Sequence, residues 1–63
     1  MENIQRVWFR AEEVFGNKAK AATWLSQPRS SFGEVSALEY ARTEAGYLLV
    51  MDMLAQLDHG FGL

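Results

Sequence analysis

The chain has 63 residues, of which 49% are apolar, and no cysteine, so it is one small domain without disulfides or thiolate metal sites. Eight acidic and six basic residues are interspersed and give a net charge of −2, which excludes a basic surface able to neutralise a nucleic-acid backbone. No apolar run approaches the roughly 20 residues of a membrane span, and the N-terminus lacks the apolar core of a signal peptide, so we expect a cytoplasmic protein and no membrane partner.

Two helices are expected in the first half of the chain. Apolar residues recur at helical spacing along one side of the first helix, namely Ile4, Val7, Trp8, Ala11, Val14 and Phe15. Gly16 is suited to a left-handed C-cap, and Asn17 is suited to cap the start of the second helix. The second helix closes at Gln27, because the following Pro28 disfavours helical backbone. It places three residues on one face: Ala21, Trp24 and Leu25.

The segment from Pro28 to Gly33 is predicted to be a loop whose one large apolar residue, Phe32, folds inward. Ser36 and Glu39 then have the form of a capping box for a short third helix, and the residues expected to point inward from it are Leu38, Tyr40 and Ala41. No segment alternates with a period of two over a useful length, so strands are not expected. The fold predicted from these patterns is an all-α single domain, a bundle of about four helices.

The last helix is predicted from about Glu44 to Asp58, with Thr43 at its start and Gly60 as its C-terminal cap. One stripe of this helix is suited to meet the core: Tyr47, Val50, Met51, Leu54 and Leu57. Further apolar residues point elsewhere, namely Leu48, Leu49, Met53 and Ala55. A helix that is apolar nearly all round is buried on more than one side. Either the other three helices wrap it, or one face meets another chain.

Catalytic chemistry has no candidate residues in this sequence. His59 is the single histidine; it lies at the end of the last helix, where the helix dipole favours positive charge, and a metal site would need further ligands. Ser30 and Ser31 lie in the predicted loop with no base marked for them. We therefore expect a protein that is not an enzyme and that holds neither a metal nor a cofactor.

Direct DNA reading is also not expected from this chain alone. A long Pro- and Ser-containing loop joins the second and third helices, whereas a helix-turn-helix motif has a turn of three or four residues. Arg6 and Arg10 share a face of the first helix, but Glu2 and Glu13 lie beside them. The surface they form is therefore mixed in charge and gives no stripe of base-reading side chains.

A set of short motifs occurs in order along residues 11–60. They are the Val14-Phe15-Gly16 turn, Ala21 ahead of Trp24-Leu25, Pro28, the Phe32-Gly33 turn, Ser36 and Leu38, Thr43-Glu44-x-Gly46, Val50, Leu54 and His59-Gly60. With this order and spacing, the chain resembles the Xre/MbcA/ParS-type toxin-binding domain of antitoxins that are paired with RES-domain toxins. Residues 61–63 then form a C-terminal tail on a single domain that spans residues 1–63.

The sequence departs from the family pattern at two positions. Glu34 stands where the family commonly has a second glycine, and Ala37 stands where it commonly has proline at the first position of the third helix. Longer relatives often carry a helix-turn-helix region before this domain, whereas only ten residues precede the matching segment here. The resemblance therefore does not imply that this chain acts as a DNA-binding autorepressor.

The resemblance implies an antitoxin domain that binds and inhibits a RES-domain toxin, an enzyme that attacks NAD or transfers ADP-ribose. In the family, the C-terminal end of the domain is thought to enter or cover the toxin's active-site cleft. The residues expected to contact the partner lie on the last helix and in the tail: Leu49, Met53, Gln56, Asp58, His59, Gly60, Phe61, Gly62 and Leu63. Glycines allow close approach to a wall, and Phe61 would supply an apolar anchor.

The alternative is a self-association module, in which the apolar residues not needed for the core pair with a second copy of the chain. The residues expected on that surface are Trp8, Leu48, Leu49 and Met53. If Phe61 and Leu63 instead fold back on Trp8 or Trp24, the tail covers the core and contact with the toxin is left to the helix faces.

Overall fold

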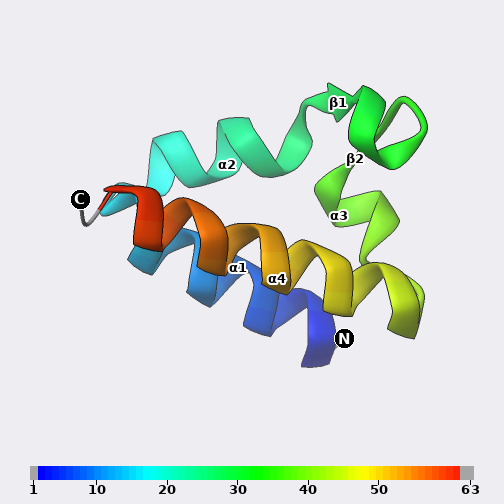
Figure 1. Ribbon diagram of the computed structural model, residues 1–63, viewed down its shortest axis with the longest axis horizontal. Coiled ribbons are helices and arrows are strands. Elements are labelled where there is room, and N and C mark those ends of the chain that lie inside the picture. The colour runs from blue at the N-terminus through cyan, green and yellow to red at the C-terminus, as the bar shows by residue number, and fades with distance from the viewer. Residues whose placement is uncertain (1, 62–63) are drawn as a thin grey trace.

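The computed structural model describes residues 2–61, and four α-helices dominate this part of the chain (Figure 1). They are α1 (Glu2–Phe15), α2 (Lys18–Ser26), α3 (Ala37–Tyr40) and α4 (Glu44–Phe61). The predicted helical bundle is confirmed. Within residues 2–61 no helix combines the length and the apolarity that crossing a bilayer requires.

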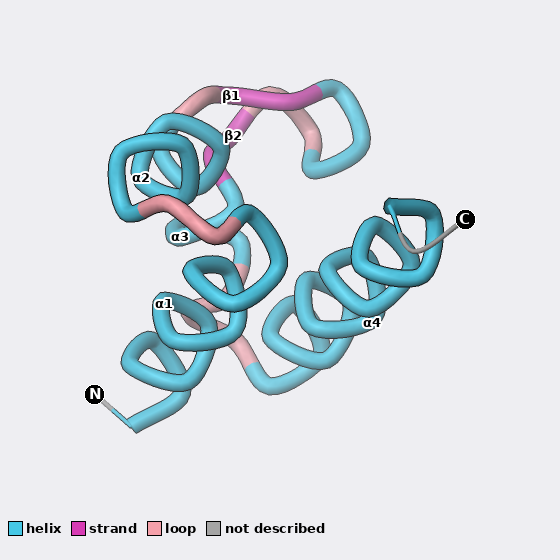
Figure 2. The backbone as a smooth tube through the Cα atoms, turned by 90° about the vertical axis from the view of Figure 1, so that its left-hand side faces the viewer, coloured by secondary structure: helices cyan, strands magenta, loops and turns pink. Residues whose placement is uncertain are grey.

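The long helices α1 and α4 lie side by side and run in the same direction, while α2 runs back above them (Figure 1). Seen from the side, α1 lies below α2, and α4 stands beside both (Figure 2). The core fills the space between these helices and α3. Its buried members come from every helix, from the connection before α3 and from the residue directly after α3: Val7, Ala11, Val14, Ala21, Leu25, Phe32, Ala37, Ala41, Val50 and Leu54.

The boundary between α1 and α2 follows the sequence prediction. Gly16 has a φ of +65°, the left-handed conformation that glycine adopts without steric cost. The Asn17 side chain accepts a hydrogen bond from the backbone N–H of Lys20 at 3.0 Å, which satisfies one of the free donors at the start of α2. Gln27 has extended backbone ahead of Pro28, so α2 ends where the proline requires it.

The connection between α2 and α3 is more ordered than the predicted loop. Two short antiparallel strands, β1 (Pro28–Arg29) and β2 (Val35–Ser36), enclose the 3₁₀ turn η1 (Ser30–Phe32). The expectation that the chain has no strand was therefore wrong, because a strand of two residues is too short to show a period in the sequence. The inward orientation of Phe32 is confirmed, since only 2% of this residue is exposed.

The turn between η1 and β2 uses left-handed backbone at two consecutive residues. Gly33 has a φ of +70°, and Glu34 has a φ of +72°. Glu34 is the one residue other than glycine with positive φ in the part of the chain that the structure describes. The position where the family commonly has a second glycine is thus one where a side chain is disfavoured on steric grounds.

The start of α3 and the start of α4 are capped as predicted. Ser36 Oγ accepts a hydrogen bond from the Glu39 N–H at 3.2 Å, and Thr43 Oγ1 accepts one from the Gly46 N–H at 3.0 Å. Gly46 also lies against the end of α3, where an added Cβ would overlap the carbonyl group of Tyr40. Glycine at this position lets α4 approach the backbone of α3 directly.

The end of α4 differs from the prediction. The helix continues through His59 and Gly60 to Phe61 rather than closing at Asp58. Within residues 2–61, the glycines with positive φ are Gly16 and Gly33, so Gly60 is a helical residue and not a left-handed cap. A glycine in a helix costs only about 1 kcal/mol relative to alanine, so the helix can continue through it. Gly62 and Leu63, predicted to belong to the tail, lie outside the described residues.

Candidate partner-binding face

The inner face of α4 packs on the other helices as the sequence predicted. Val50 and Leu54 are fully buried, while Tyr47, Met51 and Leu57 are partly buried and pack against the core. This stripe is the contribution of α4 to the fold. Because α4 packs through this stripe, the opposite side of the helix has no neighbour from α1, α2 or α3.

The outer face of α4, as we call the side that carries Leu48, Leu49, Asp52, Gln56 and His59, is exposed. Leu48 is 58% exposed and Leu49 is 44% exposed, so the other helices do not wrap α4 completely. Two neighbouring leucines exposed on a small domain form an apolar patch of the kind that marks interaction surfaces. Of the other residues predicted to point away from the core, Met53 packs against it in part, and Ala55 is partly buried.

The polar part of the outer face is held by one contact within the helix. Gln56 Nε2 donates a hydrogen bond to Asp52 Oδ2 at 3.0 Å, across one turn. Such pairs four residues apart lie on the same side of a helix and contribute only a few tenths of a kcal/mol. The pair therefore orients two polar groups next to Leu49 but leaves both available to a partner.

The side of α4 that faces α1 carries charge. Arg10 of α1 donates to Asp58 of α4, with Nη2 and Oδ2 3.3 Å apart, and Arg10 also lies 3.7 Å from a carboxylate oxygen of Glu13. Nearer the start of both helices, the Tyr47 side chain and the negative charge of Glu2 raise the pKa of Arg6. The pairs of Arg10 with Asp58 and of Arg6 with Tyr47 connect α1 to α4, whereas Glu2 and Glu13 lie within α1 itself.

The residues predicted to contact a partner are divided by this geometry. Leu49, Met53, Gln56 and Gly60 follow each other at helical spacing, so they lie along one side of α4. His59 is exposed next to them. Asp58 lies on the other side, against Arg10 of α1, although 45% of its side chain is exposed. Phe61 ends the helix, and the predictions for Gly62 and Leu63 lie outside the described residues.

Two residues of α1 bear on the alternatives left by the sequence. Trp8 packs against the core, as the predicted stripe of the first helix indicated and not as the self-association alternative required. Phe9 is 69% exposed and was not singled out. The helical pattern contains the signal for it, because Phe9 lies two residues after the buried Val7 and so projects from nearly the opposite side of α1.

Residues suited to metal binding do not come together. Among residues 2–61, no group of three or more His, Asp or Glu side chains has an arrangement that could hold a metal ion. Asp52, Asp58 and His59 are close in sequence, but Asp58 points toward α1 while the other two lie on the outer face. This part of α4 presents groups for hydrogen bonding and apolar contact.

Comparison with known proteins assigns the domain. Residues 3–60 match the family model described as the antitoxin Xre/MbcA/ParS C-terminal toxin-binding domain. Proteins named antitoxin Xre are similar to the chain: that of Pseudomonas putida is 40% identical over 53 residues, covering 84% of this chain and 33% of the relative. That of Yersinia enterocolitica is 41% identical over 56 residues, covering 87% of this chain and 38% of the relative.

The chain therefore spans about a third of the length of the curated relatives that it matches. No solved structure matches the chain. The family match includes α1 and extends almost to the end of α4, so it covers both the core and the exposed leucines. The chain belongs to the family of Xre/MbcA/ParS antitoxin C-terminal toxin-binding domains.

Proposed function

We propose that this chain, acting as a single domain over residues 1–63, binds and inhibits a RES-domain toxin that degrades NAD or transfers ADP-ribose. The observation that supports this best is the exposure of Leu48 and Leu49 on the outer face of α4, in a domain whose family is a toxin-binding one. In this proposal the outer face docks beside the toxin's active site in the cytoplasm. The C-terminal residues then block the cleft without any catalytic chemistry of their own.

The apolar part of the outer face supplies affinity. Burying a leucine side chain that was exposed is worth about 1.5–3 kcal/mol, and such residues near the centre of an interface carry much of its energy. Gln56 and Asp52 flank Leu49 with oriented polar groups. They set the register of the partner, because hydrogen bonds across an interface specify orientation.

The end of α4 supplies the blocking element. His59 and Gly60 are exposed in the last turn, and a glycine allows a partner's backbone to approach closely. Asp58 is held by Arg10 and yet remains partly exposed, so it can accept a hydrogen bond from a basic residue of the toxin. Residues 61–63 continue from this point as the segment that enters the cleft.

The first experiment measures NAD consumption by a cognate RES-domain toxin, with and without this protein. Replacing Leu48 and Leu49 by glutamine should weaken inhibition by at least tenfold, because the interface loses two apolar contacts. The matched control is Phe9→Gln, which removes a more exposed apolar side chain from α1 and should leave inhibition unchanged. Equal inhibition by the double variant and the unmodified protein would exclude the outer face of α4.

A second variant tests the tail separately. A chain that ends after Gly60 keeps the outer face but lacks residues 61–63. We expect it to bind the toxin more weakly and to inhibit NAD consumption less than the full chain does. Equal binding and inhibition by the shortened chain would show that the tail does not block the cleft.

Self-association is the second candidate, and the same exposed leucines favour it. Two copies could pair through the outer faces of α4, and Trp8 would take no part because it packs on the core. Light scattering after size exclusion distinguishes the two candidates in the absence of a toxin. A protein that stays monomeric at high concentration would exclude pairing, and loss of a dimer in the Leu48 and Leu49 variant would support it.

A further inference from the structure

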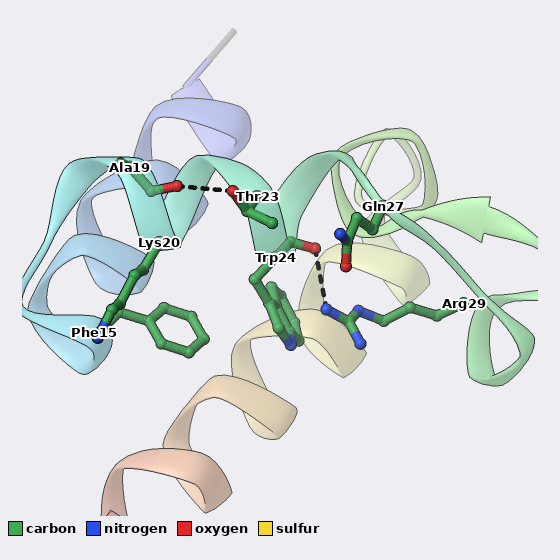
Figure 3. A pocket seen from close by; sticks show the side chains of 7 residues that line it. All are labelled: Phe15, Ala19, Lys20, Thr23, Trp24, Gln27 and Arg29. Atoms are coloured by element: carbon green, nitrogen blue, oxygen red, sulfur yellow. Dashed lines mark hydrogen bonds between the residues drawn. The ribbon is translucent and has the colours of Figure 1, made fainter.

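A second surface lies where α2 meets the end of α1 and β1. It is a pocket of about 410 Å³ whose lining includes Phe15, Lys20, Thr23, Trp24, Gln27 and Arg29 (Figure 3). It shares no residue with the outer face of α4. A ligand here would therefore bind independently of a partner on α4.

The apolar wall of this pocket is fixed in place. The rings of Phe15 and Trp24 have centroids 6.0 Å apart, and Trp24 also meets the buried Phe32 edge to face at 6.4 Å. Phe32 in turn stacks on Tyr40 at 4.8 Å. Trp24 is thus one member of a row of aromatic side chains that begins at the end of α1 and continues to α3, so its position is set before any ligand arrives.

The charge around the pocket is positive, although the whole chain is acidic. Lys20 and Arg29 line it, and no acidic residue does. From Val14 to Gly33 the sequence carries the cations Lys18, Lys20 and Arg29 and no aspartate or glutamate. An anionic group that enters the pocket therefore meets two cations in its lining. Glu34, whose backbone N–H donates to the Arg29 carbonyl oxygen at 2.9 Å, lies outside that lining.

Arg29 is held by its neighbours but lacks a full set of acceptors. Its guanidinium carbon lies 4.8 Å from the centroid of the Trp24 ring, and Nη2 donates to the Trp24 carbonyl oxygen at a long 3.4 Å (Figure 3). Arg29 Nε is buried and has no hydrogen-bond partner among residues 2–61, and Arg29 forms no ion pair with them. A buried donor without an acceptor costs free energy, so an acceptor supplied from outside would be favoured once the side chain adjusts to reach it.

We propose that this pocket binds an acidic side chain of a partner protein together with the apolar residue next to it. The carboxylate pairs with Arg29 and Lys20, and the apolar neighbour lies against Phe15 and Trp24. The volume is in the range of ligand pockets and accommodates two side chains. Gln27 and Thr23 also line the pocket. The Thr23 hydroxyl already donates to the Ala19 carbonyl oxygen at 3.0 Å, so it can accept a hydrogen bond from the backbone of such a segment, and the Gln27 amide can donate or accept one.

A peptide carboxylate suits this pocket better than a phosphate. Phosphate sites commonly use the free N–H groups at the start of a helix, but the N-terminus of α2 is capped by Asn17, which accepts from Lys20 N. The pocket offers an apolar wall with cations at its edge, which matches an acidic residue beside an apolar one. Phosphate alone would not bury any of the apolar wall that Phe15 and Trp24 form.

The test uses the dipeptide N-acetyl-Leu-Glu-amide with isotope-labelled protein, followed by the NMR signals of the two tryptophan indole N–H groups. The Trp24 signal should shift and saturate, while the Trp8 signal, which comes from outside the pocket, should stay in place. N-acetyl-Leu-Gln-amide should bind about tenfold more weakly, because it lacks the charge. Equal binding of the two peptides, or shifts only at Trp8, would overturn the proposal.

Three variants test whether the glutamate peptide binds at the cations of the pocket. Arg29→Gln should weaken binding of the glutamate peptide by about tenfold and Lys20→Gln by about threefold, since Lys20 is exposed and its charge is screened. The matched control Lys18→Gln removes the same charge from the same helix outside the pocket, and should change nothing. Because Arg29 also contacts Trp24, Lys20→Gln keeps the test valid if Arg29→Gln alters the fold.

Inorganic phosphate is the competing probe. Saturation of the Trp24 signal by phosphate, with no response to the glutamate peptide, would assign an anion site of another kind and overturn the proposal. A response to the peptide that survives in the presence of phosphate would support it. Identical effects of Lys18→Gln and Lys20→Gln would show that only net charge is sensed, and would also overturn it.

Discussion

The inner and outer faces of α4 both carry leucines, but only the inner face is buried. The inner face buries Val50 and Leu54 completely, whereas the outer face leaves Leu48 and Leu49 about half exposed. The presence of leucine alone cannot distinguish them, because Leu54 and Leu57 lie on the inner face and Leu48 and Leu49 on the outer face. The difference comes from the parallel packing of α1 beside α4, which covers one side of the helix only (Figure 2). The inner face therefore determines stability, and the outer face is free for binding.

The largest expected change in stability comes from a pair of variants that truncates one leucine on each face of α4. Leu54→Ala should lower the free energy of unfolding by about 3 kcal/mol, since it loses buried area and leaves a cavity. Leu49→Ala should change it by less than about 0.5 kcal/mol. Urea denaturation followed by tryptophan fluorescence measures both. Similar losses for the two variants would contradict the division of α4 into a buried inner face and an exposed outer face.

Gly46→Ala tests the close approach of α4 to α3. The added Cβ would overlap the Tyr40 carbonyl group, which is backbone and cannot turn away. We expect a loss of about 2 kcal/mol in the free energy of unfolding, because the two helices must move apart. The same denaturation experiment measures it. A neutral result would mean that the inner face of α4 tolerates a shift of the whole helix.

Glu34→Gly should have the opposite sign and a smaller size. Glu34 has left-handed backbone, which costs a residue with a side chain about 1 kcal/mol more than glycine. The variant should therefore raise the free energy of unfolding by about 1 kcal/mol. It would also give a more stable background in which Leu54→Ala and Gly46→Ala remain folded enough to measure. A decrease in stability would argue against the turn after Gly33.

The smallest effect is expected at Gly60. An added Cβ at this position meets no atom within 4 Å, and the residue is helical. Gly60→Ala should therefore raise the free energy of unfolding by about 0.5 kcal/mol and increase the helical signal in circular dichroism. The earlier expectation of a left-handed cap at Gly60 predicts a decrease instead. This variant therefore tests whether α4 is helical through Gly60.

Much of the fold could be predicted from local patterns. The caps at Asn17, Ser36 and Thr43 depend on one side chain and a nearby N–H, so the sequence contains them directly. The β1–β2 pair was missed because it depends on residues that meet across the η1 turn. The continuation of α4 beyond Asp58 was missed because glycine near a helix end permits both a cap and one more turn.

The candidate site was predictable in part. The sequence indicated that α4 had more apolar surface than its core stripe needs, and the exposed Leu49 lies on that surface. It could not assign Asp58 to the side facing α1, because that depends on Arg10, which lies 48 residues away in the chain. The orientations of Trp8 and Phe9, in contrast, follow from helical spacing within α1 alone. They are adjacent in sequence, but one packs against the core and the other is exposed.

The parallel arrangement of α1 and α4 also has a practical consequence for labelling. The start of α1 and the end of α4 lie at opposite ends of the molecule (Figure 1), whose longest dimension is 29 Å. A dye or an affinity tag fused ahead of α1 is therefore kept away from the C-terminal turn of α4. A donor dye ahead of α1 and an acceptor dye near His59 would report, by energy transfer, whether the distance between the two ends changes when a second protein binds.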